Sequence, residues 1–280
     1  MVPSPPIPIK PSGSRHTRQS ADARPPRVRR GVALLPSLFT MGNMFCGYAC
    51  IVYSLRGDFE SAAPFIGVAI VLDMLDGRIA RLTGTTSAFG MELDSLADVI
   101  SFGIAPAIMS YAWGLSALGR LGMFSGFLFV SGAALRLARF NIQSATGGDK
   151  RYFVGMPSPA AASIPAATVY FFQSPITDYR EALPVLAMVL LPALLMVSTI
   201  RFRSFKTIDL QMRRPYTVLL LIAAGIMAVA AHPRFVLVAM AYAYLLSAFI
   251  GLALSRFRHR NLSPATARVE PTSSAVDQQP

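Results

Sequence analysis

The chain carries at residues 71–98 the stretch VLDMLDGRIARLTGTTSAFGMELDSLAD. Asp73 and Asp76 are three residues apart and Asp94 and Asp98 are four apart, so each pair lies on one face of a helix. The short connection between the pairs (83–93) makes the two helices antiparallel neighbours, so the four carboxylates can converge. This stretch therefore predicts two adjacent helices that share an acidic site.

The sequence around this stretch is too apolar for a water-soluble protein. Hydrophobic residues make up 53% of the 280-residue chain, only 14% of residues are charged, and the mean hydropathy is +0.48. So few charges cannot cover the surface of a soluble protein of 30.2 kDa. We therefore predict an integral membrane protein, in which an aspartate inside a helix is costly and by default functional.

Apolar stretches of roughly 17–22 residues recur along the chain, and this length crosses the hydrocarbon core of a bilayer as a helix. They lie near residues 33–55, 60–82, 95–114, 121–141, 156–173, 183–200, 216–231 and 235–255. The pattern predicts an all-α, polytopic membrane helix bundle with about eight transmembrane helices. The flanking segments 1–32 and 256–280 are expected to be disordered tails, because they bury too little apolar surface to become ordered.

The basic residues predict the orientation in the membrane. With a cytoplasmic N-terminus, all but four of the 26 Lys and Arg residues fall in cytoplasmic segments, including a basic loop at 201–214. The four that fall in outer loops are Arg56, Arg120, Arg180 and Arg234. This asymmetry predicts that both termini and the acidic site lie on the cytoplasmic side. Anionic lipid accounts for the positive charge, so no nucleic-acid partner is expected.

Four converging carboxylates need a compensating charge. Hard divalent cations that prefer oxygen ligands supply it, which favours Mg²⁺ or Mn²⁺ over zinc, and two ions are expected. Arg81 is suited to bind phosphate, and Gly77, Gly84 and Gly90 let a large ligand approach the backbone. The residues alone thus indicate phosphoryl-type transfer on a phosphate or pyrophosphate ester, with a cation transporter as the alternative from another class.

The spacing Asp73-x2-Asp76-Gly77-x2-Ala80-Arg81-x8-Gly90-x3-Asp94-x3-Asp98 resembles the signature of the CDP-alcohol phosphatidyltransferases. Residues 35–48, 89–106, 136–141 and 153–162 are similar to the bacterial branch that uses serine, the CDP-diacylglycerol–serine O-phosphatidyltransferases. The resemblance implies transfer of a phosphatidyl group from CDP-diacylglycerol to L-serine, with release of CMP. It also implies a homodimer, a catalytic core of six helices over residues 33–200, and two additional transmembrane helices at 215–255.

The same resemblance implies roles for individual residues. Asp73, Asp76 and Asp94 would hold the metal ions, while Asp98 would help to hold one ion and act as the base that takes the proton from the serine hydroxyl. The CDP-diacylglycerol site would comprise Leu35, Pro36, Ser37, Leu38, Asp76, Gly77, Ala80, Arg81, Ser87 and Gly90.

Several assignments stay open on the sequence alone. Arg136 and Arg139 either bind the serine carboxylate or are ordinary cations at the cytoplasmic end of a helix. Asn141 either orients a substrate or caps that helix, and capping is expected. Residues 155–159 form either a lid over the cytoplasmic cleft or a turn that opens the next helix, and the turn is expected. Glycerol 3-phosphate is the alternative acceptor, although an acceptor with a phosphate should require an additional basic cluster.

Overall fold

The computed structural model describes residues 30–84, 87–145, 152–198, 201–203 and 215–260, with side chains over most of these ranges. The helices are α1 (Arg30–Leu55), α2 (Phe59–Thr83), α3 (Ala88–Asp98), the π-helix η1 (Val99–Ile104), α4 (Ala105–Trp113), the 3₁₀-helix η2 (Leu115–Leu118), α5 (Arg120–Ala145), α6 (Ser158–Phe171), α7 (Tyr179–Val197), α8 (Pro215–Ala231) and α9 (Pro233–Arg260). Two short strands, β1 (Tyr152–Val154) and β2 (Arg201–Arg203), pair antiparallel.

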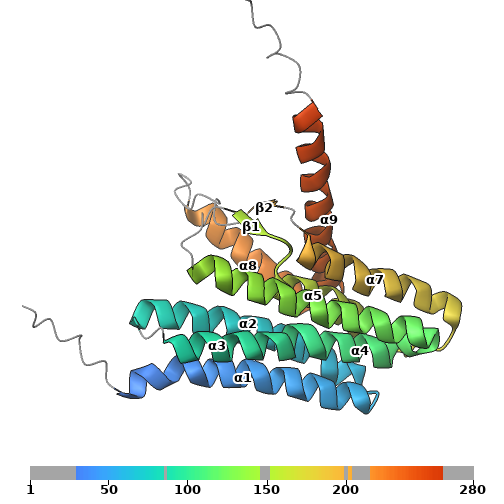
Figure 1. Ribbon diagram of the computed structural model, residues 1–280, viewed down its shortest axis with the longest axis horizontal. Helices are drawn as coiled ribbons and strands as arrows, with labels where there is room; N and C mark the ends of the chain where they lie inside the picture. The colour runs from blue at the N-terminus through green and yellow to red at the C-terminus, as the bar shows by residue number, and fades with distance from the viewer. Residues whose placement is uncertain (1–29, 85–86, 146–151, 199–200, 204–214, 261–280) are drawn as a thin grey trace, which may run out of the picture.

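The prediction of a polytopic all-helical membrane protein is confirmed. Because α3, η1 and α4 follow one another without a break, each of the eight predicted apolar stretches corresponds to one helical rod (Figure 1). Among the described residues, four rods are long and apolar enough to cross a membrane, namely Ser37–Leu55, Ala88–Trp113, Arg120–Gln143 and Tyr179–Val197. The pair of three-residue strands is a small addition that the sequence analysis did not predict.

Local hydrogen bonds explain where α2 and α3 end and begin. Gly84 ends α2 in the left-handed conformation (φ 64°), and its amide donates to the carbonyl of Ala80. The hydroxyl of Ser87 accepts the amide of Gly90 at 2.9 Å and caps the start of α3. The helix therefore begins at Ala88 rather than near residue 95, which places Asp94 inside the helix.

The acidic helices lie against α1. The most extensive helix–helix packing that the structure describes is between α1 and α2, and α1 also contacts α3 and η1. Figure 1 shows α1 and α3 side by side at one end of the bundle. Three segments therefore lie together at this end of the bundle, namely the C-terminal half of α2, the N-terminal half of α1 and the start of α3.

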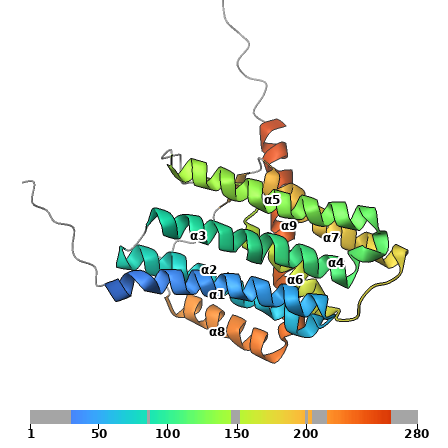
Figure 2. The same cartoon turned by 60° about the horizontal axis from the view of Figure 1, so that its bottom comes forward.

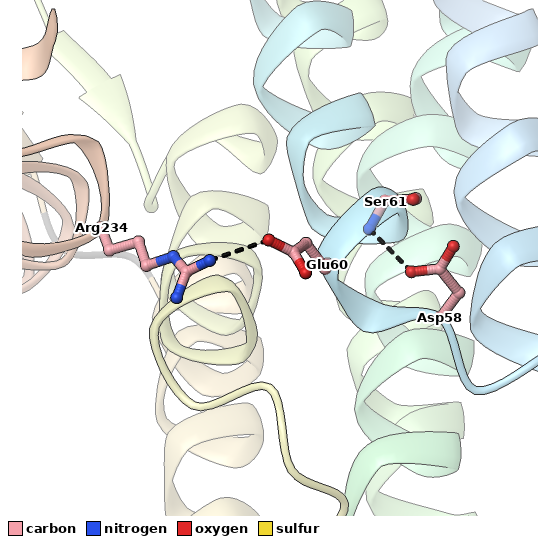
Figure 3. Close-up of polar contacts among 4 residues, drawn as sticks. All are labelled: Asp58, Glu60, Ser61 and Arg234. Carbon is pink, nitrogen blue, oxygen red and sulfur yellow. Dashed lines mark hydrogen bonds and ion pairs between the residues drawn. The ribbon is translucent and has the colours of Figure 1, made fainter.

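The C-terminal helices are arranged differently from the core. Figures 1 and 2 show α9 standing steeply across the long axis shared by α1 to α5, and α9 packs against α6 and α8. Arg234 at the start of α9 forms an ion pair with Glu60 at the start of α2, with 2.8 Å between Nη2 and Oε1 (Figure 3). In the same view Asp58 caps α2 by accepting the amide of Ser61. That α2, α6, α8 and α9 also span the membrane stays a prediction.

Some predicted boundaries shift and others lie outside the described residues. Helix α1 begins at Arg30 and α9 continues to Arg260, so both reach slightly into the segments that were expected to be tails. Residues 1–29, 204–214 and 261–280, which hold most of the predicted tails and the basic loop, are outside the described ranges.

Candidate active site

Three of the four aspartates come together between α2 and α3. Asp73 and Asp76 project from the same face of α2, and Asp94 from α3. One carboxylate oxygen from each residue lies within 4.8 Å of the others. The i,i+3 spacing on α2 and the short connection to α3 produce this cluster, as the spacing in the sequence predicts.

Asp98 lies one turn beyond Asp94 and is 8% exposed. Together with Asp73 and Asp94 it lines a cleft of about 590 Å³. The remaining walls of the cleft are Met91, Glu92, Ser95, Arg136, Leu137, Phe140, Asn141, Pro157 and Pro159. The cleft therefore lies between the acidic helices α2 and α3 on one side and α5 and the start of α6 on the other. Its size suits a small polar molecule.

Helix α1 supplies hydrogen bonds to two of the aspartates. The hydroxyl of Thr40 donates to Oδ2 of Asp76 at 2.9 Å, and the amide of Asn43 donates to Oδ1 of Asp98 at 3.3 Å. Neither Thr40 nor Asn43 was predicted from the sequence as a site residue. The signal was present, because two polar residues three positions apart share one face of an otherwise apolar helix.

The donor set fits a divalent cation. Within the part of the chain that the structure describes, none of the four aspartates makes a salt bridge. Oδ1 of Asp94 is buried and has no hydrogen-bond partner among the described residues. A buried carboxylate oxygen without a partner is costly, and a hard cation with oxygen ligands would satisfy it.

The two candidate arginines on α5 have different contacts. Arg136 lines the cleft, and its Nη1 donates to the hydroxyl of Ser158 at 2.7 Å. Arg139 instead donates to the carbonyl of Val197 at 3.3 Å, at the C-terminal end of α7, and it does not line the cleft. Only Arg136 is thus in a position to meet a ligand beside the aspartates.

Asn141 does not cap a helix end, and that expectation was wrong. Helix α5 continues to Ala145, so Asn141 lies within it and donates from Nδ2 to the hydroxyl of Ser95 at 2.9 Å. The bond connects α5 to α3 across one wall of the cleft. Of the turn predicted at 155–159, the structure has a bend at Gly155 (φ 87°), and α6 already begins at Ser158.

Among the residues expected to bind CDP-diacylglycerol whose side chains the structure describes, none lines the cleft. Arg81 is exposed on the last turn of α2, where its Nε donates to the carbonyl of Gly77 at 2.7 Å. Ser87 and Gly90 form the cap of α3, and Ala80 is half-buried one turn from the end of α2. On α1, Ser37 is half-buried and Leu38 is exposed, whereas the side chains of Leu35 and Pro36 lie outside the described residues.

Comparisons with known proteins agree with the geometry. The model of the CDP-alcohol phosphatidyltransferase family matches residues 33–200. A Helicobacter pylori protein named CDP-diacylglycerol–serine O-phosphatidyltransferase is 43% identical over 180 residues, which cover 62% of this chain and 74% of the relative. The archaetidylserine synthase of Methanothermobacter thermautotrophicus is 37% identical over 170 residues, covering 60% and 69% of the two chains. A Bacillus subtilis protein with the same name as the first is 36% identical over 127 residues, 45% of this chain and 70% of the relative.

Proposed function

Since the chain belongs to the CDP-alcohol phosphatidyltransferase family, we propose that it transfers the phosphatidyl group of CDP-diacylglycerol to the hydroxyl of L-serine. The serine oxygen forms a bond to the phosphorus that carries the diacylglycerol, and the bond from that phosphorus to CMP breaks. The convergence of Asp73, Asp76 and Asp94 beside a cleft that holds Asp98 is the observation that carries this proposal. Relatives named for serine chemistry support serine as the acceptor.

We assign metal binding to Asp73, Asp76 and Asp94, with Asp98 as an additional ligand. The cluster consists of carboxylate oxygens, which suit Mg²⁺ or Mn²⁺, and two ions are proposed. Bound there, the ions would offset the negative charge of the diphosphate during displacement. The orphaned Oδ1 of Asp94 supports this assignment.

Asp98 is the proposed base. Its carboxylate lines the cleft while Asn43 holds its Oδ1, so Oδ2 is left to accept the proton of the serine hydroxyl. A hydroxyl is a weak nucleophile at neutral pH, and removal of its proton during attack is what a positioned carboxylate contributes.

Arg136 is the proposed partner of the serine carboxylate. Ser158 uses one of its donors, and a guanidinium carries five, so the others can bind a carboxylate through two parallel hydrogen bonds. We propose that CDP-diacylglycerol lies across the end of α2 and the cap of α3, where Arg81 is exposed and Gly77 presents no side chain. Leu35 to Leu38 on α1 would complete that site.

We also propose that the site faces the cytoplasm, with both termini on that side, and that the protein is a homodimer. The ion pair between Arg234 and Glu60 supports the topology, because the charge pattern predicts both residues on the outer side. Serine and CMP are water-soluble, so a site at the cytoplasmic surface gives both of them access while the lipid tails stay in the bilayer.

CMP release by the detergent-purified full chain tests the function. CDP-diacylglycerol is supplied with Mg²⁺ or Mn²⁺ and with one acceptor at a time, which is L-serine, glycerol 3-phosphate or inositol. We expect release with serine alone and its loss in Asp98→Asn. The matched control is Asp178→Asn, the same change at an exposed carboxylate that caps α7.

Each other outcome has a defined meaning. Release with glycerol 3-phosphate in place of serine would keep the family chemistry and replace the acceptor. No release with any acceptor from a folded protein would overturn the proposal and favour the cation transporter. Full activity in Asp98→Asn would show that Asp98 is not the base.

A further inference from the structure

Helix α1 contacts the acidic site through side chains whose function the reaction itself does not explain. Thr40 is 4% exposed and Asn43 is 0% exposed, and their hydrogen bonds end on aspartates of two different helices. We propose that Thr40 and Asn43 are positioning residues, which hold Asp76 and Asp98 in the orientations that metal binding and proton acceptance require. This inference rests on the proposed function and assigns α1 a part in it.

Each bond fixes one oxygen of an aspartate. Thr40 donates to Oδ2 of Asp76, and Asp76 contributes an oxygen to the cluster that lies within 4.8 Å of oxygens of Asp73 and Asp94. Asn43 donates to Oδ1 of Asp98, and the proposed proton acceptor is the other oxygen, Oδ2. A carboxylate without such a partner rotates about its last torsion, and residues that hydrogen-bond to metal ligands restrict this rotation and raise metal affinity.

Asn43 is itself held in place by the helix that carries Asp98. The hydroxyl of Ser101, in the π-helix η1, donates to the backbone carbonyl of Asn43 at 2.8 Å. One turn further along α1, a Cβ at Gly47 would lie 2.8 Å from the Cα of Ser101, so only glycine allows this approach. The backbone at Asn43 and the helix of Asp98 are therefore in close contact, and η1 begins directly after Asp98. Single π-helical turns occur frequently at functional sites.

A purely structural explanation is that buried polar groups merely satisfy one another. It predicts that removal of either donor lowers stability and leaves metal affinity and turnover unchanged in the folded protein. The positioning role predicts the opposite, because the bonds orient reacting groups. The amide oxygen of Asn43 has no partner among the described residues, so its contact with Asp98 is the interaction of this amide that the structure records.

Mn²⁺ binding, measured by electron paramagnetic resonance on the detergent-purified full chain, tests Thr40. Thr40→Val keeps the shape of the side chain and removes the donor, and we expect Mn²⁺ affinity to fall about 10-fold or more. Thr40→Ser restores the hydroxyl and should bind within about 3-fold of the wild type, a fraction of the 10–100-fold loss typical of such positions. The control is Ser54→Ala, which removes a buried hydroxyl of α1 that bonds to the carbonyl of Cys50.

CMP release at saturating Mn²⁺ and serine tests Asn43. Asn43→Leu is similar in size without a donor, and we expect kcat to fall about 10-fold or more while KM for serine changes little. Asn43→Asp places an acceptor opposite an acceptor and should lose at least as much. Wild-type kcat in Asn43→Leu together with wild-type Mn²⁺ affinity in Thr40→Val would overturn the inference.

The controls separate this inference from the proposed function. If the wild type neither binds Mn²⁺ nor releases CMP, the proposed function fails and the inference fails with it. If the wild type does both and the variants match it, the inference alone fails. Melting temperatures verify folding, and Thr40→Ala and Asn43→Ser replace any variant that does not fold.

Discussion

Arg136 and Arg139 are one turn apart on α5 and have different surroundings. The guanidinium of Arg136 enters the cleft with the aspartates, while that of Arg139 bonds to the end of α7. Both are basic residues in the C-terminal half of α5, so their charge alone does not distinguish them. Their different partners give each residue a different expected phenotype.

Replacing Arg136 by Lys should weaken serine binding. Lys keeps the positive charge but loses the planar fork that binds a carboxylate through two bonds. Hydrogen bonds to charged groups contribute about 1.5–3 kcal/mol, so KM for serine should rise about 10- to 100-fold, with a smaller change in kcat. Steady-state kinetics of CMP release measure both quantities. Arg139→Lys is the matched control, and an equal rise in KM for this variant would contradict the assignment.

At the scale of elements, the contact between α1 and η1 positions the site. Gly47 has no side chain at the point where the two helices meet, and Ser101 uses the resulting proximity to reach the carbonyl of Asn43. Helices pack this closely where small residues face each other, which is common inside membranes. Through this contact, the position of α1 determines where Asp98 lies.

Gly47→Ala should therefore destabilise the bundle. The added methyl would lie 2.6 Å from Oγ and 2.8 Å from Cα of Ser101, so the helices must move apart. Overpacking of this kind costs about 1–3 kcal/mol, and we expect a lower melting temperature in detergent together with weaker catalysis. Gly67→Ala on α2 is the control, because a Cβ there meets nothing within 4 Å. Similar melting temperatures for the two variants would mean that α1 and η1 can move apart without a loss of stability.

At the scale of the whole molecule, the orientation in the membrane is the main prediction. The described residues carry exposed arginines at both ends of the bundle, including Arg78 near the aspartates and Arg180 at the start of α7. The positive-inside pattern predicts that Arg78 is cytoplasmic and Arg180 is not. The native cysteines, Cys46 and Cys50, are buried and should react little with a polar reagent.

Single cysteine substitutions test this orientation. A membrane-impermeant maleimide applied to intact cells should label Arg180→Cys, and it should label Arg78→Cys only after the membrane is permeabilised. The reverse pattern would place the aspartates on the outer face, where cytoplasmic serine could not reach them. The unsubstituted chain provides the background labelling.

The helical rods, the membrane class and the spacing of the aspartates on each helix follow from the amino-acid sequence alone. These properties depend on runs of apolar residues and on helical periodicity, which are local. Only the tertiary structure showed that Thr40 and Asn43 reach Asp76 and Asp98, since 36 and 55 residues separate the partners. It also distinguished Arg136 from Arg139, because two arginines one turn apart differ only in which neighbouring helix each one meets. Periodicity predicts the face of a helix on which a residue lies, and packing decides what that face contacts.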